Sequence, residues 1–204
     1  MRRNVRGYTL VEVMVAIAVL SVGVTGILSM ENAAILANRR AHEVTTATNI
    51  ARHWQEILRT DGYQWNRPSN RDRNSDLAAD TRYLCAVVGC SGMPARADAW
   101  FVPTANLPTE SAAYDHWARP LALGAPDSKY CVNLRLGWFR QPSINPIDQG
   151  VLRAEVRVWW YQEGATRDAT YNNCGTGAGL DALGRDVGRV HSVYDVATVW
   201  GIPQ

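Results

Sequence analysis

The sequence predicts an α+β fold in which one long N-terminal α-helix packs on a C-terminal antiparallel β-sheet. Residues 8–30 are almost continuously apolar, and residues 31–60 carry apolar side chains at steps of three or four. Later segments alternate apolar and polar side chains, as strands covered on one face do. About 140 of the 204 residues lie beyond the helix, enough for one modest domain with its own core.

The apolar run 8–30 is long enough to cross a membrane. Its 23 residues, at ~1.5 Å per residue, exceed the ~30 Å hydrocarbon core of a bilayer. Glu12 is the only ionisable side chain in the run apart from the weakly acidic Tyr8. A charge inside such a span costs roughly 2.5–3.5 kcal/mol on insertion scales. We therefore expect a cation on another molecule to compensate Glu12.

The helix is expected to continue as an amphipathic segment over residues 31–60. Its apolar stripe consists of Ala34, Ala37, Ala41, Val44, Ala47, Ala51, Trp54 and Leu58, widened at the end by Ile50 and Ile57. The pair Asp61-Gly62 predicts the end of the helix, because glycine is favoured just past a helix C-terminus. A turn- and charge-rich connecting loop is predicted for residues 61–80.

The remaining residues, 81–204, are predicted to form the β-sheet head. The clearest strand is 152–161, where apolar residues alternate with Arg153, Glu155 and Arg157. Residues 130–136 alternate in the same way, residues 187–200 are rich in valine, and a shorter strand is predicted around 83–88. Three to four strands of this kind indicate an antiparallel sheet covered on one side by the amphipathic half of the helix.

The first seven residues form a short basic leader that carries Arg2, Arg3 and Arg6. A secretory signal places its small-residue cleavage site after the apolar core, whereas here Gly7 comes before it. Cutting after Gly7 would remove the leader and leave the whole apolar helix on the mature chain. The positive-inside rule keeps the leader in the cytoplasm and sends the head across the membrane.

The stretch Gly7-Tyr8-Thr9-Leu10-Val11-Glu12 resembles the class III leader of the type IV pilin family. The resemblance implies cleavage between Gly7 and Tyr8 by a prepilin peptidase, followed by N-methylation of Tyr8. The family's usual first mature residue is Phe, and this chain has Tyr. Gly23 and Gly26 make the helix look most like that of the minor pilins of the PilV kind.

The family resemblance implies a minor pilin that is incorporated into a type IV pilus or primes its assembly. It further implies that Glu12 guides assembly by pairing with an N-terminal amine, most plausibly on a neighbouring subunit. The implied partners are major and minor pilins through the N-terminal helix, the prepilin peptidase, the inner-membrane assembly platform and a tip adhesin. The precursor would lie in the inner membrane with a periplasmic head, and the mature chain in the pilus filament or tip at the cell surface.

The sequence is also compatible with two other functions, and with two roles for the paired glycines of the helix. A minor pseudopilin of a type II secretion system would share the leader, the helix and Glu12, and a bitopic envelope binding protein would share the span alone. Gly23 and Gly26 weaken the helix by roughly 1 kcal/mol each relative to Ala. They serve either close packing between helices or local unwinding when subunits pack into a filament.

The four cysteines Cys85, Cys90, Cys131 and Cys174 face an oxidising compartment if the head crosses the membrane. Four cysteines allow three pairings, and the sequence does not choose among them. The first two are close enough to close a small loop, which would leave Cys131 with Cys174. The resemblance favours that second pair, because pilins often staple their C-terminal region in this way.

Other functions are disfavoured by the residues present. We expect no enzyme, because no catalytic triad, carboxylate pair or cofactor fingerprint is recognisable. We expect no metal: the cysteines lack a second tight Cys/His pair for zinc, and the partial calcium loop at 72–76 lacks its Gly and terminal Glu. The glycine-rich run 175–179 lacks the Lys-Ser/Thr of a phosphate loop. Without the leader the chain has 18 basic and 19 acidic side chains, so no nucleic acid is expected.

Overall fold

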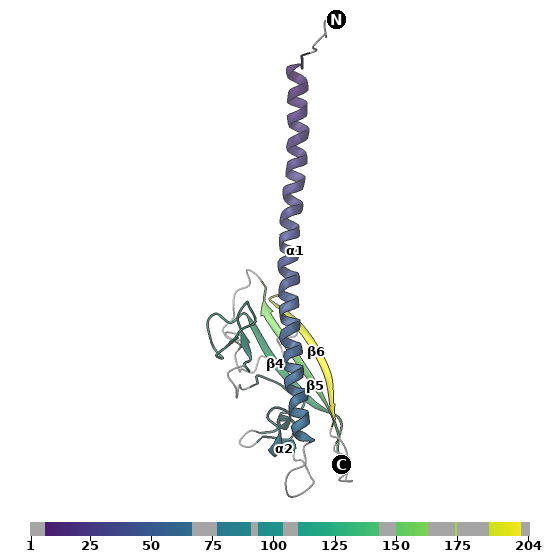
Figure 1. Cartoon of the computed structure of the whole chain (residues 1–204), viewed down its shortest axis with the longest axis vertical. Helices are drawn as coiled ribbons and strands as arrows, with labels where there is room; N and C mark the ends of the chain where they lie inside the picture. Colours follow the sequence, from purple (N-terminus) through teal and green to yellow (C-terminus); the bar gives the residue numbers. More distant parts are fainter. Residues whose placement is uncertain are drawn as a thin grey trace. The chain divides into compact units, whose positions relative to one another are not determined.

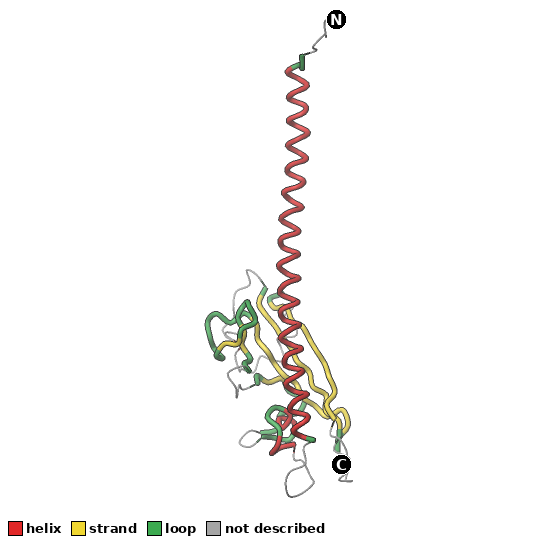
Figure 2. Tube along the Cα trace, viewed as in Figure 1, coloured by secondary structure: helices red, strands yellow, loops and turns green. Residues whose placement is uncertain are grey.

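The computed structural model of the chain describes residues 7–66, 77–90, 94–103, 110–142, 150–162, 174 and 188–200. The chain divides into two compact units, Met1–Glu43 and Val44–Gln204. The fold is α+β, with a long N-terminal helix followed by an antiparallel sheet, the layout of a type IV pilin (Figures 1 and 2). The predicted fold class is therefore confirmed.

Two short helices and a sheet follow the long helix. The helices are α1 (Leu10–Trp65), α2 (Leu77–Asp80) and the 3-10 helix η1 (Leu84–Val87). The strands are β1 (Trp100–Phe101), β2 (Ala113–Tyr114), β3 (Pro120–Leu121), β4 (Tyr130–Arg140), β5 (Val151–Tyr161) and β6 (Val190–Trp200). The strands predicted at 130–136, 152–161 and 187–200 thus correspond to β4, β5 and β6.

The described strands form one six-stranded antiparallel sheet in the order β3-β2-β4-β5-β6, with β1 paired to β4. The register places Leu134 opposite Val156 and Ala154 opposite Ala197. Side chains that alternate along one strand therefore share a face with alternating side chains on the next. This register gathers the apolar residues of β4 and β5 on one face, where they cluster with buried residues of α1. Figure 1 shows the C-terminal part of α1 lying across these strands.

The core of the second unit lies between the end of α1 and this face of the sheet. Trp54 and Leu58 of α1 are fully buried, as are Val132, Val156 and Val158 of the two central strands. Burying each such side chain contributes about 1.5–3 kcal/mol relative to leaving it exposed. The C-terminal part of the amphipathic segment, from Thr46 onward, therefore covers the sheet.

The buried stripe of α1 is shorter than the sequence predicted. It begins at Thr46 and Ala47, whereas Ala34, Ala37, Ala41 and Val44 are exposed. Strands of 11 residues, such as β4 and β5, span about 36 Å, which matches roughly 24 helical residues at 1.5 Å per residue. The sheet is thus long enough to cover only the last turns of α1.

The predicted helix end at Asp61-Gly62 is wrong, because α1 continues to Trp65. Gly62 is buried inside the helix, and a Cβ added there would lie 2.6 Å from Cγ1 of Val199 on β6. Glycine is therefore required by the close approach of β6 rather than by a helix stop. Glycine is favoured both just past a helix C-terminus and where two elements approach closely, so the sequence alone does not distinguish the two cases.

Two further predictions differ from the described chain. The segment around 83–88 forms the 3-10 helix η1 instead of a strand, since Asp61 binds three consecutive backbone N–H groups at its start. The predicted loop 61–80 contains the last turn of α1 and the short helix α2. The residues of the loop at 67–76, including the partial calcium motif, lie outside the described residues, as does the glycine-rich run 175–179.

The opposite face of the sheet is also partly buried, although the sequence predicted cover on one side only. A second cluster forms around Trp159, Val190 and the Cys131–Cys174 disulfide. Beside it, Arg157 is buried and donates a 3.1 Å hydrogen bond to Asn133, with its guanidinium carbon 4.2 Å from the ring centroid of Trp100. Alternating charges on a strand therefore did not mean a fully solvated face.

Candidate functional site

The leader junction lies in exposed, non-helical backbone. Gly7 and Tyr8 precede the first helical residue, Leu10, and both are exposed. The Tyr8 side chain is 85% exposed, so nothing in the described chain shields the bond between Gly7 and Tyr8. A bond in this position is accessible to a partner enzyme.

Thr9 forms the N-cap of α1. Its carbonyl accepts hydrogen bonds from the backbone N–H of Glu12 (3.1 Å) and Val13 (3.3 Å), and its hydroxyl accepts a further 3.3 Å bond from Glu12. Threonine is among the residues favoured at this position because its side chain satisfies an orphan helical N–H. The sequence reasoning missed this role, although Thr-x-x-Glu before an apolar run is a recognised helix-start signal.

Glu12 occupies the third position of the first helical turn and is exposed. A carboxylate near a helix N-terminus is stabilised by the helix dipole, typically by about 0.3–1 kcal/mol. The described part of the chain offers Glu12 no ion-pair partner. Its charge is therefore available to a cation from outside the described chain.

The first unit presents an exposed apolar helical surface. Among the described residues, α1 is long and apolar enough to cross a membrane by length and composition, and it lies near the N-terminus. Its hydroxyl side chains bond to the helix itself: Ser21 donates to the carbonyl of Ala18 at 2.8 Å, Ser29 to that of Gly26 at 2.8 Å, and Thr25 to that of Ser21. These bonds satisfy polar groups that hydrocarbon could not satisfy.

Gly23 and Gly26 lie within the unbroken helix α1. A Cβ added at either glycine would meet no atom within 4 Å. Neither glycine is thus required by packing inside the described chain. Both leave the helix surface open to a close neighbour.

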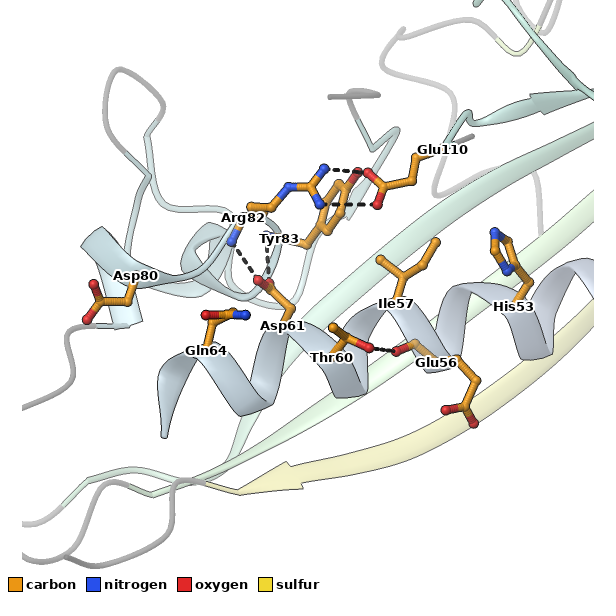
Figure 3. Close-up of a pocket in the computed structure, with 10 residues that line it drawn as sticks. All are labelled: His53, Glu56, Ile57, Thr60, Asp61, Gln64, Asp80, Arg82, Tyr83 and Glu110. Atoms are coloured by element: carbon orange, nitrogen blue, oxygen red, sulfur yellow. Dashed lines mark hydrogen bonds and ion pairs between the residues drawn. The ribbon is translucent and has the colours of Figure 1, made fainter. Parts of the chain in front are cut away.

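A cavity of about 570 Å³ lies in the second unit, beside the end of α1 (Figure 3). At its wall the Asp61 carboxylate accepts hydrogen bonds from the backbone N–H groups of Arg82 (2.7 Å), Tyr83 (2.8 Å) and Leu84 (2.9 Å). The carboxylate thereby caps the segment that leads into η1. Sequence reasoning missed this role, because the partners lie more than 20 residues away.

A second carboxylate at this cavity, Glu110, is also engaged within the protein. It forms a bidentate pair with the Arg82 guanidinium, with bonds of 3.1 and 2.5 Å, and accepts a 2.8 Å hydrogen bond from the Tyr83 hydroxyl. Burial raises the pKa of the Tyr83 phenol well above its usual range, and the Glu110 carboxylate raises it further. This arrangement links two segments of the head, and its groups bind one another.

Two further polar groups of the head, Tyr114 and Asp115, have shifted pKa values. Burial raises the pKa of Tyr114 to about 12, against the effect of a 3.0 Å hydrogen bond that Trp54 donates to its hydroxyl. Desolvation acts to raise the pKa of Asp115. Hydrogen bonds from Arg119 and from the backbone of Trp117 outweigh it, so the net pKa lies below the ordinary value.

All four cysteines lie in described residues and form two disulfides. Cys85 is paired with Cys90, and Cys131 with Cys174, which is one of the three pairings that the sequence left open. The first closes a loop at η1 and the second ties β4 to residue 174. All four thiols are therefore used in disulfide bonds.

Comparison with known proteins identifies the N-terminal segment. Residues 2–28 match the family model of the prokaryotic N-terminal methylation motif. No curated protein and no solved structure matches the chain. The matched segment contains the exposed Gly7–Tyr8 junction, the Thr9 cap and Glu12. The chain thus carries a type IV pilin-like leader, which supports a processed subunit of pilin or pseudopilin type and fits a membrane-anchored precursor.

Proposed function

We propose that this chain is a minor pilin, of the PilV kind, that prepilin peptidase processes between Gly7 and Tyr8. The mature subunit is incorporated into a type IV pilus or primes its assembly, and its new N-terminus on Tyr8 is methylated. The observation that carries the proposal is the methylation motif over residues 2–28, whose cleavage point is exposed and whose Glu12 has no ion-pair partner in the described chain.

Cleavage supplies the cation that Glu12 lacks. Before processing, Tyr8 is linked to Gly7 through a neutral amide; afterwards it carries a positively charged amine. When the apolar helices of neighbouring subunits pack together, that amine pairs with Glu12 of a neighbour. The pair mainly fixes the register of the subunits, because buried ion pairs add little net stability but are costly to break. Assembly therefore waits for cleavage.

The exposed apolar side chains of α1 supply most of the affinity. Leu10, Val19, Leu20 and Val22 are each at least 65% exposed. Burial of apolar area yields about 25 cal/mol per Å² in water, and between helices leaving lipid the gain comes from packing and small-residue contacts. Gly23 and Gly26 offer such contacts, since their surfaces are open. Other pilins, the inner-membrane assembly platform and a tip adhesin are the proposed partners.

The proposal is tested by the N-terminus of the protein extracted from its native membrane. Intact mass and N-terminal sequencing are expected to give a chain that begins at Tyr8 and carries one methyl group. A chain that still begins at Met1, while the peptidase processes its other substrates, would contradict the proposal. That result would favour a bitopic envelope protein with a binding head.

A second test addresses Glu12. Glu12→Ala and the nearly isosteric Glu12→Gln are expected to insert and be cleaved normally, yet to appear in purified filaments at least tenfold less than wild type. This estimate is conservative, since leaving a buried charge unpaired costs about 3–5 kcal/mol. Glu31→Ala is the matched control, because Glu31 is an exposed acidic residue of the same helix. Normal incorporation of both Glu12 variants would refute the assembly role.

A minor pseudopilin of a type II secretion system is the second candidate, because the same motif and Glu12 serve it equally. Deleting the gene separates the two functions: loss of pili with intact protein secretion supports the pilus, and the reverse supports the pseudopilus. In either case we propose a structural subunit rather than an enzyme. Supporting this, Asp61 and Glu110 at the described cavity are bound by groups of the same chain.

A further inference from the structure

The start of α1 is fixed by Thr9. The helix begins at Leu10, and the Thr9 hydroxyl and carbonyl both accept hydrogen bonds from the Glu12 backbone N–H, at 3.3 and 3.1 Å. The Thr9 side chain is itself exposed and packs into no described cavity. Within the described part of the chain, its hydroxyl bonds to the Glu12 N–H, and this bond ends the helix on the N-terminal side of Leu10.

Gly7 works in the same direction. A Cβ added at Gly7 would meet no atom within 4 Å, so packing within the described chain does not require glycine there. Glycine is however a poor helix former, which makes extension of α1 past Thr9 less favourable. The next residue upstream with strong N-cap preference is Asn4. A helix that began after Asn4 would enclose the bond between Gly7 and Tyr8.

Leader removal requires that bond to be free of a helix. Hydrolysis breaks the bond between the Gly7 carbonyl carbon and the Tyr8 nitrogen; water supplies the hydroxyl to the carbon and a proton to the amine. In a helix the Gly7 carbonyl would accept a hydrogen bond from Val11 four residues on, and its backbone could not lie extended in an enzyme cleft. The position of the helix start thus controls access to the scissile bond.

We propose that Thr9 is a positioning residue for leader removal, because its N-cap holds the Gly7–Tyr8 bond in non-helical backbone. This inference rests on the proposed function, since it concerns cleavage by prepilin peptidase. It differs from direct recognition, in which the peptidase would read the shape of the Thr9 side chain. The two explanations rank the substitutions of Thr9 in different orders.

The test measures the rate of leader removal from the full-length precursor by purified prepilin peptidase in phospholipid vesicles, followed by intact mass. Thr9→Ser and Thr9→Asn keep a good N-cap but change the shape of the side chain. Thr9→Val keeps the shape but removes the cap, and Thr9→Ala removes both. Thr25→Val is the matched control, because the Thr25 hydroxyl bonds within the same helix far from the junction.

If Thr9 acts as a cap, the Ser and Asn variants are cleaved within twofold of wild type. The Val and Ala variants are then cleaved about fivefold more slowly, the factor that corresponds to a typical lost N-cap. Hydrogen exchange of the same precursors shows the cause directly: protection of the backbone N–H groups extends to Tyr8 and Thr9 in the Val and Ala variants only.

Two results overturn the inference by itself. One is Val cleaved like wild type with Asn cleaved slowly, which means that shape is read; the other is slow cleavage of Val and Ala without any change in hydrogen exchange. A wild-type precursor that is not cleaved at all, beside a control prepilin that is, overturns the proposed function and this inference together. The two kinds of failure are therefore distinguishable.

Discussion

Replacing Asp61, a buried carboxylate at the wall of the cavity, is expected to destabilise the head. Asp61 is 4% exposed, and its carboxylate accepts three backbone hydrogen bonds of 2.7–2.9 Å. Figure 3 shows the two from Arg82 and Tyr83. Asp61→Ala leaves the N–H groups of Tyr83 and Leu84 buried without an acceptor, while that of Arg82 is part-buried and can turn to water. At about 1–3 kcal/mol for each of these two buried donors, the expected loss is about 2–6 kcal/mol.

The loss is measured by denaturant unfolding of the full chain in detergent micelles, followed by fluorescence of the buried tryptophans. Glu56→Ala is the matched control: it lies on the same helix, is 66% exposed and, within the described part of the chain, forms an exposed ion pair with Arg59, so a change within about 0.5 kcal/mol is expected. Asp61→Asn should fall between the two, because its amide oxygen can accept while its NH₂ group opposes a donor. An Asp61→Ala loss no larger than that of Glu56→Ala would refute the reasoning.

Three further outcomes are expected from the same unfolding assay. Gly62→Ala should cost about 1–2 kcal/mol of unfolding free energy, because a methyl group 2.6 Å from Val199 overpacks the core. The same substitution should cost less when it is made in a Val199→Ala background, where the clashing side chain is absent. Replacing Cys131 and Cys174 by Ala should cost about 4 kcal/mol on the chain-entropy model, against about 2 for the shorter disulfide. Because burial raises the pKa of Tyr114 to about 12, its contribution to stability is intact below about pH 10 and is lost as the pH rises toward 12. Tyr114→Phe should therefore lose about 2–3 kcal/mol less than wild type over this range, and the loss that remains comes in part from Tyr83, whose pKa is also raised.

The sequence predicted the elements whose signals are local and periodic. The alternation in 152–161 and 130–136 predicts strands because each apolar side chain repeats the same orientation two residues later, and both strands are present as β5 and β4. The apolar stripe predicted the buried face of α1 from Ala47 onward. It could not predict where cover ends, because that depends on the length of strands more than 80 residues away.

The hydrogen bonds of Asp61 and Glu110 could not be predicted for the same reason, because their partners are distant in the sequence. No local pattern in the sequence marks Asp61 or Glu110 as a buried carboxylate, yet they bind groups around Arg82, 21 and 28 residues away. Gly62 shows how a correct local rule can mislead, since glycine after an acidic residue indicates a helix stop equally well. Only the close approach of β6 distinguishes a packing glycine from a capping one.

The motif around Glu12 could serve only to start the helix, but the free energy gained in that way is too small to offset the burial of a carboxylate. Thr9 and Glu12 begin a helix, and a carboxylate in the first turn gains about 0.3–1 kcal/mol from the helix dipole. If the helix packs among neighbours, as proposed, burying an unpaired carboxylate costs several kcal/mol even after relaxation. Helix-start stabilisation offsets only a fraction of that cost, and any carboxylate-free N-terminus would avoid it altogether. The capping role therefore explains why the helix begins where it does, whereas the proposed burial of Glu12 would require a cation such as the Tyr8 amine that the proposed cleavage releases.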